Sequence, residues 1–330
     1  HFADIFDVLD EIIEYGFPIS TNIDDIRLST GGIVKPSSIL GRESRKSSIL
    51  GQLTPSSTTR ALPDPSDTPW RALGIKYRKN EIFVKVEERL HALIEGTDVL
   101  RLYVDGQINI KNKLSGMPEC CCGFGDNVVV DLQLPTETAP GEVYLQDARF
   151  HESVSLREMG PKRQINFIPP DKDFTLMLYK CQDGVLLPLY VNANVKLVGN
   201  RVIFKARLLL ELPEKMTARD VVLKVEAPPG VIQQVHQALH GKVRWHAEEN
   251  AFRWRIAKLS GLQKHEFTAE VDVLNGQNWL RPPMSLDFHV DMFLLLGISV
   301  KYLKVKERLN YKTVKWVEYV THAGNYEIRY

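Results

Sequence analysis

Residues 242–256 read Lys-Val-Arg-Trp-His-Ala-Glu-Glu-Asn-Ala-Phe-Arg-Trp-Arg-Ile, with apolar and basic side chains alternating on both sides of a polar centre. Successive side chains of a β-strand point to opposite faces, so this alternation predicts two strands that each have one apolar face. The residues Ala-Glu-Glu-Asn at 247–250 supply a turn between them. The stretch therefore predicts a β-hairpin with an apolar face for a core and a basic face for solvent or a ligand.

The same period of two recurs from Trp70 to the C-terminus and predicts the fold class. The segments that show it are residues 82–87, 100–110, 174–179, 201–212, 221–225, 265–273, 285–290 and 314–320. Gly, Pro and Asn/Asp turns separate them, and segments with a helical period are short and few. Many short strands joined by turns favour antiparallel β-sandwiches over alternating βαβ units.

The first 68 residues have a different character. In Phe2–Tyr15, apolar residues repeat at intervals of three and four, which predicts an amphipathic helix that ends at Gly16-Phe17-Pro18. Such a helix cannot bury its apolar stripe alone, so we expect it to belong to a domain that lies largely upstream. Residues 21–68 are rich in Ser, Thr and Pro and contain no aromatic residue, which predicts a flexible linker.

Bulk properties narrow the function classes. A net charge of +1 gives no global attraction to nucleic acid, so binding of anions requires a local patch. The cysteines show no metal-ligand spacing and favour a reducing, cytoplasmic compartment. No apolar run approaches the about 20 residues needed to span a bilayer. Nucleotide-binding, zinc-protease and serine-hydrolase motifs are absent from the sequence. We therefore expect a binding module without cofactor or metal, and a hydrolase remains an alternative that no constellation of residues supports.

Two features suggest binding. In the hairpin, strand parity places five basic side chains on one face if the two strands are in register: Lys242, Arg244, His246, Arg253 and Arg255. Such a cluster suits an inositol phosphate or another multivalent anion, although a solvated sheet face explains the spacing equally well. In residues 314–320, Trp316 and Glu318 share one face and Val317 and Tyr319 the other. This strand is a candidate sheet edge for an added peptide, but the pattern alone favours a tryptophan packed in the core.

Several stretches resemble the medium (mu) subunit of clathrin adaptor complexes, in order and over residues 70–330. They are Gly74–Val84 (GIKYRKNEIFV), Lys113–Glu119 (KLSGMPE), Ile165–Asp171 (INFIPPD), Arg281–Ser285 (RPPMS), Val300–Val305 (VKYLKV) and Lys315–Val317 (KWV). Residues 119–120, 309–311 and 314–316 look most similar to the endocytic adaptor complex 2, while the complex 1 subunit remains possible. Residues 8–12 and 15–18 resemble the end of the family's longin-like N-terminal domain.

The resemblance implies an architecture. Residues 1–20 would be the last helix of a truncated longin-like domain, followed by the linker at 21–68. Residues 69–330 would form the mu homology domain, an elongated pair of antiparallel β-sandwich subdomains. One subdomain would comprise residues 69–186 together with 297–330, and the other would be the inserted segment 187–296.

The resemblance also implies a cargo site for tyrosine-x-x-bulky-hydrophobic sorting signals, bound as an added strand beside Trp316 and Val317. Phe83 would stack on the signal's tyrosine ring, with Trp316 as a wall and Lys111 near the hydroxyl. The bulky-hydrophobic pocket would be lined by Ile82, Val84, Val300, Leu303 and Val317.

Two positions depart from the family pattern. The family has an aspartate at the position of Lys85 and an arginine at the position of Glu318, and both contact the tyrosine hydroxyl. Here the signs are exchanged. We expect that a Lys donor and a Glu acceptor still hold the phenol, with altered affinity. The alternative is a coat scaffold that no longer reads tyrosine signals.

The resemblance adds a ligand, partners and a location. Lys242, Arg244, His246 and Arg255 fall where the endocytic member carries lysines for phosphatidylinositol 4,5-bisphosphate, which favours a lipid site over a solvated face. The implied partners are cargo tails with Tyr-based signals, two large and one small adaptor subunits, and clathrin indirectly. The implied location is the cytoplasmic side of clathrin-coated pits at the plasma membrane, or the trans-Golgi network and endosomes for a complex 1 subunit.

Overall fold

The computed structural model describes residues 13–14, 17–18, 68–125, 128–129, 143–274, 279–308 and 311–330. The chain divides into two units, residues 1–61 and residues 62–330. In the first unit, β1 (Ile13–Glu14) pairs antiparallel with β2 (Phe17–Pro18). The helix predicted over Phe2–Tyr15 is therefore wrong at Ile13 and Glu14, because their backbones pair with β2 rather than along a helix. The rest of that helix and the linker up to residue 67 lie outside the described residues.

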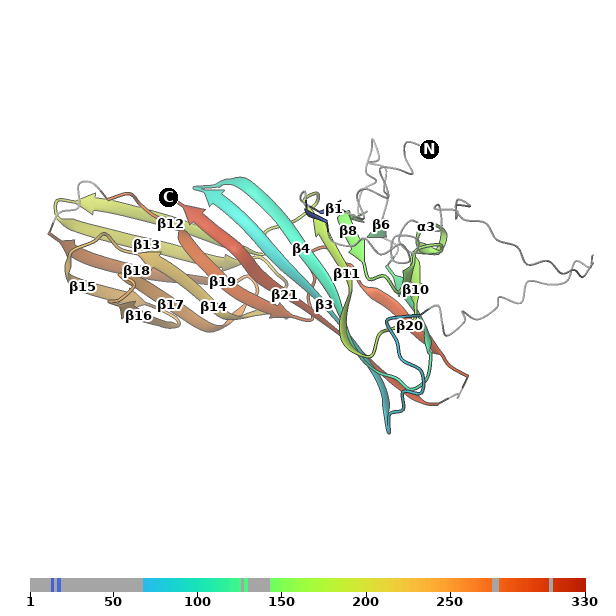
Figure 1. The fold of residues 1–330 in the computed structure, drawn as a ribbon. Coiled ribbons are helices and arrows are strands. Elements are labelled where there is room, and N and C mark those ends of the chain that lie inside the picture. Colours follow the sequence, from blue (N-terminus) through green and yellow to red (C-terminus); the bar gives the residue numbers. More distant parts are fainter. Residues whose placement is uncertain are drawn as a thin grey trace, which may run out of the picture. The chain divides into compact units, whose positions relative to one another are not determined.

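The second unit is built on one nine-stranded sheet. In spatial order its strands are β16 (Lys242–His246), β17 (Ala251–Ser260), β14 (Thr217–Glu226), β19 (Met284–Asp291), β21 (Thr313–Arg329), β3 (Asn80–Glu95), β4 (Asp98–Lys113), β11 (Lys172–Cys181) and β8 (Gln146–Phe150). The long strands β3, β4 and β21 lie side by side in its middle (Figure 1).

Two four-stranded sheets complete the core. One has the order β12 (Leu189–Val198), β13 (Arg201–Leu210), β18 (Lys264–Val273) and β15 (Val231–Ala238). The other has the order β20 (Val300–Lys306), β5 (Glu119–Phe124), β10 (Gln164–Phe167) and β9 (Val154–Ser155). The remaining elements are the short parallel pair β6 (Val128–Val129) and β7 (Val143–Tyr144) and the helix α3 (Met159–Lys162).

The strand-rich fold predicted from the sequence is confirmed, and each predicted strand lies within or overlaps one found. The pairing differs from the expected antiparallel pattern at the centre of the large sheet. There β21 runs parallel to β3, with Trp316 beside Phe83 and Glu318 beside Lys85. Parallel strands need a long connection, and more than 200 residues separate these two in the sequence. The division into residues 69–186 with 297–330 and 187–296 stays a prediction.

The nine-stranded sheet has an inner and an outer face. Its inner face carries Ile82, Val84 and Trp254, which are at most 1% exposed. Both smaller sheets pack against this inner face. The rings of Trp254 and Phe267 of β18 stack with centroids 5.6 Å apart, and the backbone N–H of Val300 in β20 donates to the Tyr319 hydroxyl at 3.1 Å. The outer face, which carries Phe83, Lys85 and Arg255, is thereby left for binding.

A buried carboxyl, Glu88, lies on the inner face of β3. The backbone N–H groups of Leu295 and Leu296 donate to its Oε2 at 2.5 and 3.2 Å, and the Tyr179 hydroxyl lies 3.4 Å from Oε1. Burial raises the pKa of Glu88 to about 7, although these hydrogen bonds favour the charged form. The carboxyl ties the loop after β19 to the centre of the sheet.

We expect Glu88 to make the fold less stable as pH rises. The unfolded carboxyl loses its proton near pH 4.5 and the folded one near 7, so the stability present below pH 4.5 is lost between these values, by about 3 kcal/mol. Glu88→Gln keeps an acceptor and removes this slope. Urea unfolding at pH 5 and pH 8 checks it, with Glu95→Gln, an exposed residue of the same strand, as control. A native-like pH slope in Glu88→Gln would exclude this carboxyl as the cause.

Candidate functional site

The predicted site residues meet on the outer face of the sheet. Phe83 lies beside Trp316 of β21 on one side and Lys111 of β4 on the other, and Lys111 lies beside Asp173 of β11. In the next row, Lys85 lies between Glu318 and Asn109, which is followed by Thr175. Side chains of directly paired residues point to the same face. Four strands that are distant in the sequence thus bring one aromatic pair and four charges together.

A cavity of about 550 Å³ opens over these rows. Its lining consists of Phe83, Lys85, Asn109, Ile110, Lys111, Asp173, Phe174, Thr175 and Glu318. Trp316 stands beside it with 61% of its surface exposed. The core packing that the strand pattern favoured for Trp316 is therefore wrong, because this part of β21 has its Trp316 face on the uncovered side of the sheet. An aromatic floor, an exposed aromatic wall and charges of both signs suit a phenol ring.

The exchanged charges are not paired with each other. Lys85 Nζ binds Glu87 Oε1 of its own strand at 2.5 Å, and no described residue forms an ion pair with Glu318. Burial would raise the pKa of Glu87, but hydrogen bonds from Lys85 and Gln107 outweigh it and lower the pKa. Lys111 lies 3.9 Å from Asp173 Oδ2. The Glu318 carboxylate is therefore left as an acceptor for a ligand.

The residues predicted for the bulky-hydrophobic pocket lie elsewhere. Ile82, Val84 and Leu303 are buried core residues at 0, 1 and 8% exposure, and Val300 and Val317 are half-buried against the core. None of these five lines the cavity that contains Phe83. Val317 shares its face with Lys315 and Tyr319, which reach strand β20: Lys315 Nζ donates to the Leu303 carbonyl at 2.9 Å, and Tyr319 accepts from Val300. The apolar residues thus gather on the inner side of β21.

One edge of β21 is open beside this site. Among the described residues, β19 pairs with β21 only from Val320 onward, and the Met292 N–H donates to the Tyr319 carbonyl at 2.8 Å. Residues 313–318 have β3 as their single neighbouring strand in the part of the chain that the structure describes. Their outward backbone groups form a template to which an extended peptide can add as a strand.

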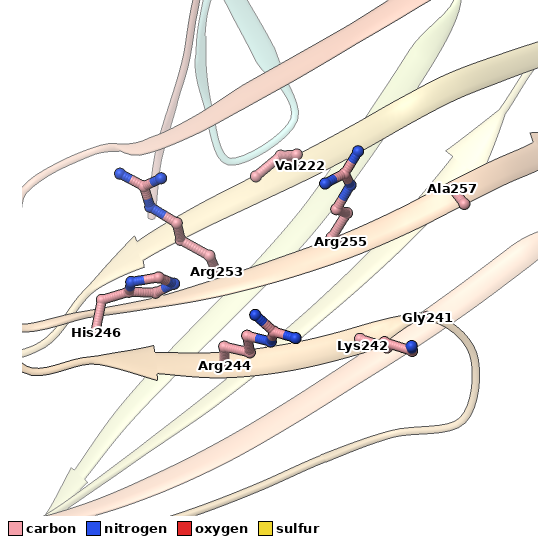
Figure 2. Close-up of a pocket in the computed structure, with 8 residues that line it drawn as sticks. All are labelled: Val222, Gly241, Lys242, Arg244, His246, Arg253, Arg255 and Ala257. Atoms are coloured by element: carbon pink, nitrogen blue, oxygen red, sulfur yellow. The ribbon is translucent and has the colours of Figure 1, made fainter.

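The basic hairpin has the register that the sequence required. Lys242 pairs with Arg255, and Arg244 with Arg253, so the basic side chains share one face while Val243, Trp245, Phe252 and Trp254 share the other. Figure 2 shows Lys242, Arg244 and His246 on one strand beside Arg253 and Arg255 on its neighbour. With Val222, Gly241 and Ala257 they line a cavity of about 730 Å³.

Acidic neighbours hold part of this cluster. Arg253 binds Glu249 at 2.5 Å, and Arg255 forms a short ion pair with Asp220. Lys242, Arg244 and His246 form no ion pair with any acid in the described ranges. Arg253, absent from the residues assigned to the lipid site by resemblance, belongs to the cavity by geometry. The strand parity of the hairpin already indicated it.

The hairpin and the Phe83 cavity lie on the same face of the nine-stranded sheet. Arg255 pairs with Val222 of β14, which pairs with Asp287 of β19, and His289 two residues on pairs with His322. The His289 and His322 ring centroids are 6.0 Å apart. His322 pairs with Arg89, which shares the outer face of β3 with Lys85 and Phe83. The register therefore carries one uncovered face from the hairpin to the cavity.

Asn109, Asp173 and Thr175 are the cavity residues that sequence reasoning missed. The Thr175 hydroxyl donates to Asn109 Oδ1 at 2.9 Å, which fixes the side of the cavity toward β11. Alternation in residues 100–110 indicated which face Asn109 takes, but nothing in the sequence announced that β11 would lie next to β4. Among the described residues, no three His, Cys, Asp or Glu side chains are placed to hold a metal ion. No helix in that part is long and apolar enough to cross a membrane.

Comparisons with known proteins agree with this fold and site. The "Adaptor complexes medium subunit family" matches residues 68–330. The AP-2 complex subunit mu of Schizosaccharomyces pombe is 34% identical, over 98% of this chain and 76% of its own length. The subunit of the same name from Dictyostelium discoideum is 32% identical, over 100% and 76%. The Danio rerio Fcho1 mu homology domain, solved with a bound Eps15 peptide, has a TM-score of 0.54 at 13% identity, over 76% of this chain and 97% of that one.

Proposed function

Because the chain belongs to the adaptor complex medium subunit family, we propose that it binds tyrosine-x-x-bulky-hydrophobic signals of membrane cargo as a strand added to β21. The observation that carries this is the open edge at residues 313–318 beside the cavity over Phe83. Backbone hydrogen bonds along the edge would supply affinity, and the flanking pockets specificity.

The cavity supports a defined pose for the signal. The tyrosine ring lies on Phe83 and against Trp316, and its hydroxyl end meets Lys85, Lys111 and Glu318. The hydroxyl donates to the Glu318 carboxylate, which no described cation neutralises, and accepts from a lysine. The bulky residue three positions on packs on the other side of the edge, over Val317, Val300 and Leu303, with Ile82 and Val84 beneath them.

Calorimetry tests this with the full chain and two peptides, Tyr-x-x-Leu and the same peptide with Phe for Tyr. Tyr-x-x-Leu should bind, and the Phe peptide should bind more weakly, because it leaves the polar groups at the hydroxyl position without a partner. Absence of Tyr-x-x-Leu binding at millimolar concentration would overturn the proposal and favour a coat scaffold that kept the fold. Equal binding of the two peptides would exclude the hydroxyl contact to Lys85 and Glu318.

We also propose that the basic hairpin binds phosphoinositide head groups. A head group with several phosphates matches a cavity with cations on two neighbouring strands. Lys242 and Arg244 can take a phosphate directly, whereas Arg253 and Arg255 exchange an acidic partner for it. Each cation near an anionic surface contributes about 1 kcal/mol. Since the hairpin and the Phe83 cavity share the outer face, one membrane can present both ligands to it.

Charge reversal at the hairpin is expected to abolish binding to vesicles. Lys242→Glu with Arg244→Glu removes two cations that have no acidic partner among the described residues and places two repelling charges in the cavity. Sedimentation with phosphatidylcholine vesicles containing phosphatidylinositol 4,5-bisphosphate measures it. Lys196→Glu with Lys205→Glu, two exposed lysines of the β12–β13 sheet, makes the same change in net charge. Equal pelleting of the two double variants would refute a local site.

The family membership sets the wider context of the proposal. The matched relatives are named as subunits of the AP-2 complex, so we propose assembly with two large subunits and one small one and indirect contact with clathrin. The proposed location is the cytoplasmic face of coated pits, where the protein is held peripherally. Residues 69–186 with 297–330 and residues 187–296 are proposed as two subdomains, with the cargo site on the first and the lipid site on the second.

A further inference from the structure

Two turns at one end of the β14–β17 region expose a leucine at their tips. Leu239 lies in the turn between β15 and β16 and is 79% exposed. Leu262 lies in the turn between β17 and β18 and is 57% exposed. A single exposed leucine needs no explanation, but two of them at neighbouring turn tips form a local apolar surface.

The two turns lie together and are held firmly. The ring of His240, next to Leu239, lies 4.5 Å from that of His265, which follows the Leu262 turn. Trp254 Nε1 donates to the His240 carbonyl at 2.8 Å, and the Leu262 N–H donates to the Leu210 carbonyl at 2.7 Å. Gly241 has φ +84°, and a Cβ there would come within 2.6 Å of the Arg255 carbonyl. The backbone of each turn is thus bonded to the sandwich, and the leucines are not free to fold into the core.

Lysines surround these tips. Lys242 follows the first turn, Lys258 and Lys264 flank the second, and Lys215 lies next to Met216, whose carbonyl accepts from Gly261 at 3.0 Å. All four are exposed, and none forms an ion pair in the described part of the chain. The acidic residues in these segments are Glu214 and Glu266, and Arg207 binds Glu266 at 2.7 Å. The tips therefore combine apolar ends with a net positive surround.

Gly241 and Lys242 also line the cavity of the basic hairpin, so the tips adjoin it. We propose that Leu239 and Leu262 insert into the head-group and upper acyl region of an anionic membrane while the lysines stay at the phosphates. The chemistry is that of interfacial anchors, in which an apolar group is buried a few ångströms deep beside basic side chains. This inference rests on the proposed phosphoinositide binding and adds an apolar contribution to it.

Vesicle binding of the full chain tests the insertion. Leu239→Ser with Leu262→Ser should weaken partitioning into vesicles of phosphatidylcholine, phosphatidylserine and phosphatidylinositol 4,5-bisphosphate by roughly tenfold for each leucine. Leu274→Ser with Leu280→Ser, at exposed positions 73% and 91% accessible, is the matched control and should bind as the native chain. Leu274 follows the opposite end of β18 from Leu262. The defect of the tip variant should persist in high salt, which screens the lysines but leaves the apolar contribution.

A second measurement does not depend on affinity. An environment-sensitive fluorophore on Leu239→Cys should shift to the blue on adding the same vesicles, while one on Leu274→Cys should not. The native chain, treated with the same label, corrects for its own cysteines. Loss of binding on charge reversal at Lys242 and Arg244, with native binding by the tip variant and no shift at position 239, would overturn insertion and leave the lipid site standing. No vesicle binding by the native chain would overturn both.

Discussion

Trp316→Ala should lower the affinity for a Tyr-x-x-Leu peptide by about 30-fold or more, the usual cost of losing an aromatic anchor of about 2 kcal/mol. Trp316 lies beside Phe83 in register and is 61% exposed, so it is available to a ligand and contributes little to the core. The thermal midpoint of the variant should therefore stay close to that of the native chain. Calorimetry with the peptide and a melting curve measure the two effects on the same sample.

Val314→Ala is the matched control for this variant. Val314 is on the same strand and face as Trp316, is 41% exposed, and does not line the cavity over Phe83. Its peptide affinity should be native. If both variants bind the peptide as the native chain does, the wall of the site is not Trp316 and the tyrosine ring lies elsewhere.

A second large effect is expected at Arg71, which fastens the start of the mu homology domain to two loops. It is 3% exposed, and its guanidinium donates to four carbonyls. They belong to Leu114 at 2.6 Å, Gly116 at 2.8 Å, Pro169 at 2.9 Å and Pro170 at 3.4 Å. Burial lowers the pKa of Arg71, while nearby Asp171 favours the charge. Tyr77 ties the same region, since its hydroxyl donates to Asp171 at 2.6 Å.

Arg71→Met should lower the free energy of unfolding by about 3–5 kcal/mol, because it leaves several buried carbonyls without a donor. Arg71→Lys should recover only part of this loss, since an ammonium lacks the planar fork that reaches all of them. Urea unfolding measures both, with Arg78→Met, an exposed arginine seven residues on, as the control. A loss for Arg71→Met no larger than that for Arg78→Met would show that the carbonyls find other donors.

The period of two predicted the strands well because each buries one face, and that requirement is written into every strand separately. Phe83 and Lys85, for example, alternate with buried Ile82 and Val84 in any β fold. Strands with weak alternation were missed: Glu119–Phe124 carries three cysteines and Gly123, whose Cβ would overlap the Tyr302 ring at 2.3 Å. A glycine required by a ring 179 residues away cannot be recognised before the partner strand is known.

The sites divide in the same way. The basic face of the hairpin was predictable, since all five cations lie on two strands joined by a short turn. The cavity over Phe83 was not predictable from spacing, because β21, β3, β4 and β11 come from four distant parts of the chain. The likeness to a known family supplied Phe83, Lys111 and Trp316 there. It did not supply Asn109 and Thr175, nor the pairing of Lys85 with Glu87, which depends on the local rotamers around a changed charge.

The position of β21 has a consequence for how the protein is made. Without β21, the nine-stranded sheet would separate into a β16–β17–β14–β19 part and a β3–β4–β11–β8 part. These 17 residues close the sheet and leave the ribosome last. Pairing β21 with β3 also closes the longest loop in the domain, a non-local step that is slow. The peptide-binding edge therefore comes into existence only when synthesis has ended, so a nascent or C-terminally truncated chain has no β21 edge on which to capture cargo.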